Sequence, residues 1–107
     1  MALHVTKRPT LTIASGGTAS GVSADFDALA ITIYAPATVT ASQIGVEVEP
    51  TSSGTDFVTL QSGGSDVVFT AGKALVISPP AFKQMRLTST SVEGADRTFP
   101  MTQIIAV

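Results

Sequence analysis

Nine glycines and six prolines are spread along the 107 residues, and most stretches between them are too short for a free-standing helix. The longer stretches alternate apolar and polar residues with a period of two, which is typical of a half-buried β-strand. In residues 43–49 the apolar positions are Ile44, Val46 and Val48. Glu47 and Glu49 alternate with them and are expected on the solvated face. The pattern therefore predicts an all-β protein.

The same alternation, or a short apolar run between turn residues, predicts further strands along the chain. Residues 61–66 contain Gly63 and Gly64, and these glycines suit a hairpin turn that needs positive φ. About eight strands with closely spaced turn signals predict an antiparallel β-sandwich of jelly-roll-like form. The predicted strands cover residues 10–14, 29–34, 43–49, 57–60, 67–70, 74–78, 82–89 and 101–107.

The length fits one domain, and we place a single β-sandwich domain at residues 10–107, preceded by an N-terminal arm at residues 1–9. The one helical candidate is residues 24–30, which Ser23 would cap. The apolar alternation continues through Ile33, so a strand entered through a loop is favoured over that helix.

The N-terminal segment has the pattern of an edge strand that adds to another subunit. Leu3 and Val5 alternate with small or polar residues, so their side chains would set the register of such pairing. Pro9 holds Arg8 extended and has no N–H to donate, so pairing is expected to end there. Lys7 and Arg8 are candidates to contact an acidic surface of a partner. A frayed terminus, or a strand paired within its own subunit, is the alternative.

Charge and residue types exclude several classes of function. Charged residues make up 13% of the chain, against about 25% in an ordinary soluble domain. The net charge of −2 provides no basic excess for a phosphate backbone, so no nucleic-acid partner is expected. There is no cysteine, and His4 is the one histidine. These residues provide no nucleophile–base pair and no multi-histidine metal site, so we expect no enzyme activity and no cofactor.

Two acidic pairs are candidate sites. Glu47 and Glu49 lie roughly 7 Å apart by strand geometry, a separation that glycoside hydrolases use, but a solvated strand face is the favoured interpretation. Asp25 and Asp27 lack the further oxygen ligands that calcium needs. No metal site is predicted.

Lys83 and Arg86 are candidate contacts for an acidic protein partner or a glycan, beside the alternative of ordinary solvated side chains. Tyr34 lies on the strand face opposite Ile31 and Ile33, where an aromatic ring could stack on a sugar. The other aromatic residues are all phenylalanine and are expected in the core, which counts against a glycan-binding module.

The low charge and the positive mean hydropathy favour a protein that lives in an assembly. Threonine and serine supply most of the polarity, and such a surface tolerates close protein contact. Apolar runs such as residues 28–31 and 104–107 are far shorter than the roughly 20 residues of a membrane helix, so no membrane span or leader is expected. We expect a homo-oligomer, with a trimer first and a dimer second.

Residues 29–91 follow a definite order of strands and turns. It consists of a strand ending in Tyr34-Ala35-Pro36, a Val46-Glu47-Val48 strand, Asp56-Phe57 followed by Leu60, an Ala71-Gly72 turn, and Phe82 followed by Arg86-Leu87 and Ser89. This order resembles that of small β-sandwich proteins from the virions of tailed bacteriophages. Those proteins occur as capsid decoration proteins, head fibres and tail modules.

The resemblance implies a structural protein without enzyme activity, and it transfers no functional residue. The function that it favours is capsid decoration: the protein would bind the major capsid protein on the capsid exterior and stabilise the shell. It would be made in the host cytoplasm. A tail or fibre component of the virion is the alternative within the structural class, and a glycan-binding β-sandwich module is the alternative outside it.

Overall fold

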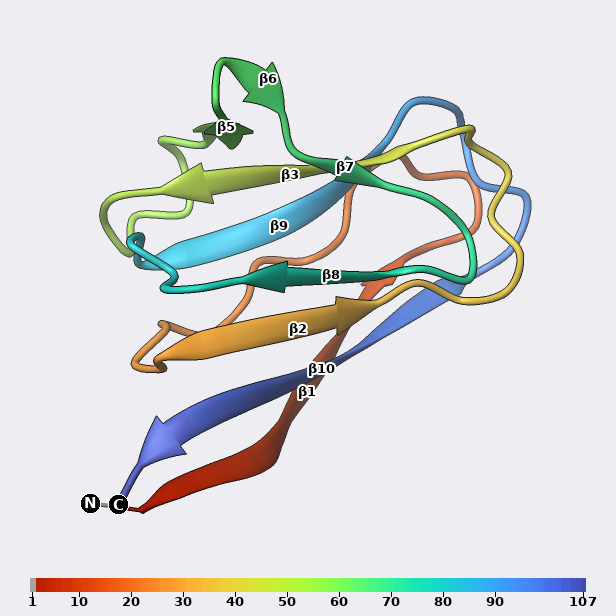
Figure 1. Cartoon of the computed structure of the whole chain (residues 1–107). Helices are drawn as coiled ribbons and strands as arrows, with labels where there is room; N and C mark the ends of the chain where they lie inside the picture. The colour runs from red at the N-terminus through yellow and green to blue at the C-terminus, as the bar shows by residue number, and fades with distance from the viewer. Residues whose placement is uncertain (1) are drawn as a thin grey trace.

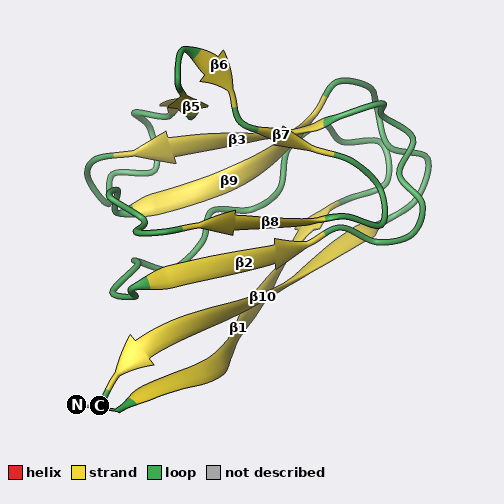
Figure 2. Ribbon diagram, viewed as in Figure 1, coloured by secondary structure: helices red, strands yellow, loops and turns green. Residues whose placement is uncertain are grey.

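The computed structural model describes residues 2–107, and in this range the chain is all-β, as predicted (Figures 1 and 2). No helix in the described range could span a membrane. The strands are β1 (Leu3–Ile13), β2 (Ala30–Tyr34), β3 (Ile44–Glu49), β4 (Val58–Thr59), β5 (Gln61–Ser62), β6 (Ser65–Asp66), β7 (Val68–Phe69), β8 (Ala74–Ile77), β9 (Gln84–Ser89) and β10 (Arg97–Ala106).

All strand pairings are antiparallel. One sheet has the order β1-β10-β2-β8. In a second sheet β3 pairs with β9 along its whole length, and the other edge of β3 is shared by β4 and β7. β5 and β6 form a separate two-stranded hairpin, whose turn contains Gly63 and Gly64 with φ of 62° and 83°. The predicted glycine turn is therefore confirmed.

The two larger sheets contribute to one apolar core. Period-two alternation puts every second side chain of β2, β3 and β9 into it, which is why those strands were recognisable in the sequence. Phe69 of β7 meets Phe99 of β10 edge to face, with ring centroids 6.1 Å apart. The side chains that are buried most completely include Ile13, Ile31, Ile33, Phe99, Ile44, Val46, Met85 and Leu87.

The segment before β2 is a loop rather than a helix, and it covers the free edge of β9. The N–H groups of Ser20, Ser23 and Phe26 donate to the backbone carbonyls of Leu87, Met85 and Lys83. In return, the N–H of Met85 donates to the Ser23 hydroxyl at 3.0 Å. Ser23 is thus an edge partner for β9 and caps no helix.

Replacing Ser23 with alanine is expected to lower the free energy of unfolding by about 1–2 kcal/mol, because the N–H of Met85 would be buried without an acceptor. Urea unfolding of both proteins measures the difference. Ser62→Ala, at an exposed position, is the control and should change stability by less than about 0.5 kcal/mol. Equal effects of the two substitutions would contradict the assigned role of the Ser23 hydroxyl.

β1 corrects the prediction that pairing ends at Pro9. Residues 3–8 pair with residues 106–101 of β10 in the same chain, which is the alternative that the sequence left open. Pairing then resumes with Leu11 opposite Phe99, after a shift of register between Arg8 and Leu11. The ladder is thus interrupted by a bulge at residues 9 and 10, and one strand runs on through both residues.

Candidate interaction surfaces

We call the paired ends of β1 and β10 the terminal ribbon (residues 2–8 and 101–107), and beyond Ile104 the ribbon continues as two strands alone. Ala2 and Val107 exchange backbone hydrogen bonds of 3.1 and 3.0 Å. The neighbouring strand β2 pairs with β10 only as far as Ile104. Figure 1 shows β1 and β10 running beyond the other strands to the two chain ends, consistent with molecular extents of 44 × 27 × 26 Å.

The terminal ribbon exposes apolar side chains that its own chain leaves uncovered. Leu3 is 61% exposed, Val5 is 70% exposed and Val107 is 65% exposed. In the register of the strand pair, Leu3 and Val5 lie opposite Ala106 and Ile104 on one face. Full burial of one such side chain is worth about 1.5–3 kcal/mol, and most of that stabilisation is unused in the single chain. A projecting apolar strand pair is typical of a surface that contacts another protein.

The two cations of the predicted arm have different environments. Lys7 is exposed. The Arg8 guanidinium instead donates to the Gln103 side chain at 2.9 Å and to the carbonyl of Ala24 at 3.0 Å. Its central carbon, Cζ, lies 4.3 Å from the centroid of the Phe26 ring. Burial lowers the pKa of Arg8. Arg8 therefore anchors the terminal ribbon to its own domain, and Lys7 is the cation available to a partner.

The predicted pair of Lys83 and Arg86 is not brought together as a free basic patch. The Nε of Arg86 lies 2.6 Å from a carboxylate oxygen of Glu47, and its guanidinium lies 4.5 Å from the centroid of the Phe57 ring. Lys83 is exposed and takes part in no ion pair within residues 2–107. Arg86 is occupied inside its own sheet, because β9 places it directly opposite Glu47 of β3.

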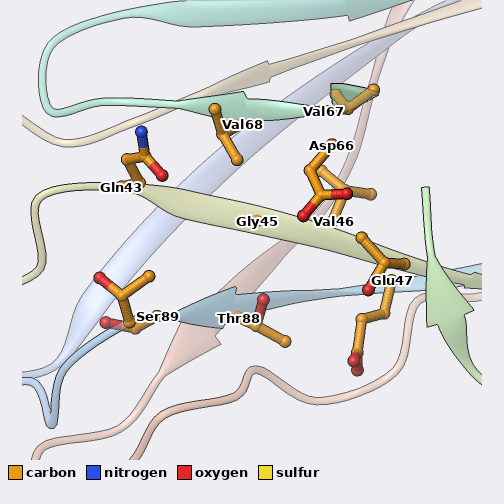
Figure 3. Close-up of a pocket in the computed structure, with 11 residues that line it drawn as sticks. Gln43, Gly45, Val46, Glu47, Asp66, Val67, Val68, Thr88 and Ser89 are labelled. Carbon is orange, nitrogen blue, oxygen red and sulfur yellow. The ribbon is translucent and has the colours of Figure 1, made fainter. Parts of the chain in front are cut away.

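A groove of about 180 Å³, lined by both polar and apolar side chains, lies on the outer side of β3 and β9 (Figure 3). Gln43, Glu47, Asp66 and Thr88 contribute to its lining. Its middle is flat at Gly45, where a β-carbon would lie 2.9 Å from the Thr88 hydroxyl. Glu47 is already paired with an arginine, and the lining contains no aromatic ring on which a sugar could stack.

Glu49 is buried, which corrects the prediction that it lies on a solvated strand face. The loop of residues 50–57 folds back over it. The N–H of Gly54 donates to one carboxylate oxygen at 2.7 Å, and the Ser53 hydroxyl and the N–H of Asp56 donate to the other at 3.1 and 3.2 Å. Burial alone raises the pKa of Glu49, but these hydrogen bonds outweigh burial and lower it. Strand alternation gives the direction of the side chain and not what covers it.

Glu93 is a second buried carboxylate, and it is not among the candidate residues predicted from the sequence. One oxygen accepts from the N–H of Thr40 at 2.7 Å and from Nε of Arg97 at 3.0 Å. The other accepts from the N–H of Ala41 at 3.0 Å and from the Ser89 hydroxyl at 2.6 Å. Burial raises the pKa of Glu93, but the four donors more than compensate and hold it at about 2. The one sequence signal is the spacing of Glu93 and Arg97, four residues apart.

Acid is expected to destabilise the protein between about pH 4.5 and pH 2. Both buried carboxylates have lower pKa values in the folded state than the ordinary 4.5, so their contribution is complete above that pH and is lost as pH falls. Melting temperatures measured from pH 6 to pH 2 test this expectation. Glu93→Gln has no charge to titrate at that position, so its melting temperature should fall less over the same range. An equal fall in both proteins would contradict the role of Glu93.

Asp25 and Tyr34, which were also singled out from the sequence, each make contacts within the chain. The Ser52 hydroxyl donates its one proton to the Asp25 carboxylate and lies 2.9 and 2.8 Å from the two carboxylate oxygens. Residues 2–107 contain no group of three or more histidine, cysteine, aspartate or glutamate side chains arranged to hold a metal ion. Tyr34 is 41% exposed on β2, and its hydroxyl lies 3.3 Å from that of Thr102.

Neither a protein-family model, nor a curated protein, nor a solved structure matches this chain. Its function is therefore inferred from its own residues. Among the surfaces described, the terminal ribbon combines exposed apolar side chains with a sheet edge, and this combination suits protein contact.

Proposed function

We propose that this protein is a jelly-roll-like β-sandwich that serves as a non-enzymatic structural component of a tailed-phage virion, where it decorates the capsid exterior. The terminal ribbon carries the proposal, because its exposed Leu3 and Val5 need a protein partner for their burial. The charge-poor surface and the order of strands over residues 29–91 support it further. The partner would be the major capsid protein.

Decoration would stabilise the shell through mass action. A protein that binds the expanded shell and not its dissociated subunits lowers the free energy of the shell by its own free energy of binding. Repetition over many equivalent sites makes modest contacts sufficient. Hydroxyl-rich surfaces with few charges allow neighbouring molecules to approach closely without mutual repulsion.

Two measurements test the proposal. Mass spectrometry of virions from the phage that encodes the protein should find it at a copy number comparable to that of the major capsid protein. A copy number of about a dozen would instead indicate a tail component, and absence from the virion would refute both. The purified protein should also co-sediment with expanded capsids and much less with unexpanded ones, so equal binding to the two forms would contradict the stabilising mechanism.

The glycan alternative makes a different prediction for the same protein. A glycan-binding module would bind an immobilised polysaccharide, and Tyr34→Ala would weaken that binding because the exposed ring would be lost. We expect no such binding. Saturable polysaccharide binding that depends on Tyr34 would overturn the decoration proposal.

A further inference from the structure

The outer edge of β1 offers a short row of free backbone groups. Ala2 and Val107 donate backbone hydrogen bonds to each other. In an antiparallel ladder every second residue faces the partner strand, so the N–H and C=O groups of the even-numbered residues from 2 to 8 point toward β10. Those of Leu3, Val5 and Lys7 point away from the sheet. No strand within residues 2–107 pairs with this edge at residues 3–8.

Pro9 limits the length of the free edge. It is the next outward-pointing position after Lys7, and it has no N–H group to offer. The register of β1 also shifts between Arg8 and Leu11, so the strand bends away there. A partner strand can therefore pair with Leu3, Val5 and Lys7 and no further.

We propose that this edge pairs with the same edge of a second copy, antiparallel and across a two-fold axis at Val5. Val5 then lies opposite Val5 of the second copy, and Leu3 lies opposite Lys7 of that copy. All three outward N–H groups of each chain are used, and the two four-stranded sheets become one continuous sheet. The inference deepens the proposed function, because it names the contact that makes the structural protein an oligomer.

Charge separation and apolar continuity favour this register. The two Lys7 side chains lie at opposite ends of the paired segment, whereas an axis at Thr6 would bring them closer together and place Leu3 opposite Pro9. With the axis at Val5, the exposed Leu3 and Val5 of both copies lie on one face of the joined sheet beside Ile104. The pairing sets these side chains side by side, and the face that they share stays open to a capsid subunit.

The geometry fixes the number of copies. An antiparallel pairing of one edge with itself has two-fold symmetry and closes after two chains. It therefore gives a dimer, the second of the two oligomers expected from the sequence, and not a trimer. The paired segments are short, so the contact is smaller than the roughly 800 Å² per partner of a standard interface, and micromolar affinity is expected.

Engineered disulfides test the register, because the natural chain has no cysteine. Directly opposed residues of a hydrogen-bonded pair have Cα atoms about 5.5 Å apart, which suits a disulfide. Val5→Cys should therefore form a covalent dimer upon mild oxidation. His4→Cys and Thr6→Cys should each crosslink poorly alone and efficiently when mixed, because His4 lies opposite Thr6 of the second copy. Crosslinking of Thr6→Cys alone as fast as Val5→Cys would overturn the proposed register.

Val5→Pro tests the backbone contact itself. The N–H of Val5 points away from β10, so its removal should leave the fold intact and weaken dimerisation at least about tenfold. Val5→Ala is the matched control that keeps the N–H. Light scattering at tens to hundreds of micromolar measures the association, and melting curves report the fold. A wild-type monomer throughout this range, a trimer, or an unchanged Val5→Pro dimer would each overturn the inference.

These measurements use no capsids, so the two proposals fail separately. A dimer that does not bind capsids contradicts decoration and leaves the edge pairing intact. A monomer that binds capsids contradicts the edge pairing and leaves decoration intact.

Discussion

Replacing Glu93 with alanine is expected to lower the free energy of unfolding by about 3 kcal/mol, and the melting temperature by roughly 12–24 °C for a domain of this size. The substitution leaves the N–H groups of Thr40 and Ala41 without their acceptor, and it leaves Arg97 without its counter-charge. Ala41 is 5% exposed, so water cannot readily replace the lost carboxylate there. Thermal and urea unfolding of purified variants measure the loss.

Two further variants separate the possible causes. Glu93→Gln keeps the shape but puts an NH₂ group where an oxygen accepted from two donors, so it should still destabilise, by less than alanine does. Glu47→Ala removes a carboxylate from an ion pair with Arg86 whose side chains are 26% and 35% exposed, and it should cost at most about 1 kcal/mol. An effect of Glu93→Ala no larger than that of Glu47→Ala would contradict the role of Glu93 as a buried acceptor.

The sequence predicted those parts of the fold that are encoded locally. β2, β3 and β9 lie within a residue or two of the predicted ranges, because each has one face in the core and one outside, and alternation records that directly. The predicted turn at Gly63 and Gly64 is confirmed for a similar reason, since positive φ favours glycine.

Features that depend on distant parts of the chain were not predictable in this way. Ser23 would suit a helix N-terminus equally well, and what decides its role is the edge of β9, 62 residues away. Pro9 forbids one backbone hydrogen bond, but the sequence does not show that β1 resumes pairing after a bulge. The two buried carboxylates are likewise defined by loops that fold over them.

The candidate interaction surfaces show the same difference between locally encoded features and those that depend on distant parts of the chain. The alternation of Leu3 and Val5 predicted a strand that adds to another subunit, whereas β1 pairs with β10 of its own chain and forms the edge of that sheet. The same reasoning proposed Arg8 and Arg86 as contacts for a partner. Both are engaged within the chain, with the Phe26 ring and with Glu47 respectively. A cation in a sequence carries no sign of the ring or carboxylate that the fold will set beside it.

Removal of residues 2–6 is expected to weaken binding to expanded capsids at least about tenfold, with a change of only a few degrees in the melting temperature. The removed side chains are largely exposed in the single chain, so the fold loses little burial, whereas a partner loses the apolar surface of Leu3 and Val5. The deletion stops before Arg8 because its contacts with Gln103 and Phe26 hold the domain together.

Arg8→Ala is the matched control for this truncation, with the opposite expectation. It should lower the melting temperature, because the Phe26 ring and the Gln103 side chain lose their partner, and it should leave capsid binding nearly unchanged because Leu3 and Val5 remain. Co-sedimentation with capsids and thermal melting, applied to both variants, distinguish the two roles. If the truncated protein binds capsids as well as the full chain does, the terminal ribbon is not the attachment surface. If binding falls only in proportion to stability, residues 2–6 act through the fold of their own domain.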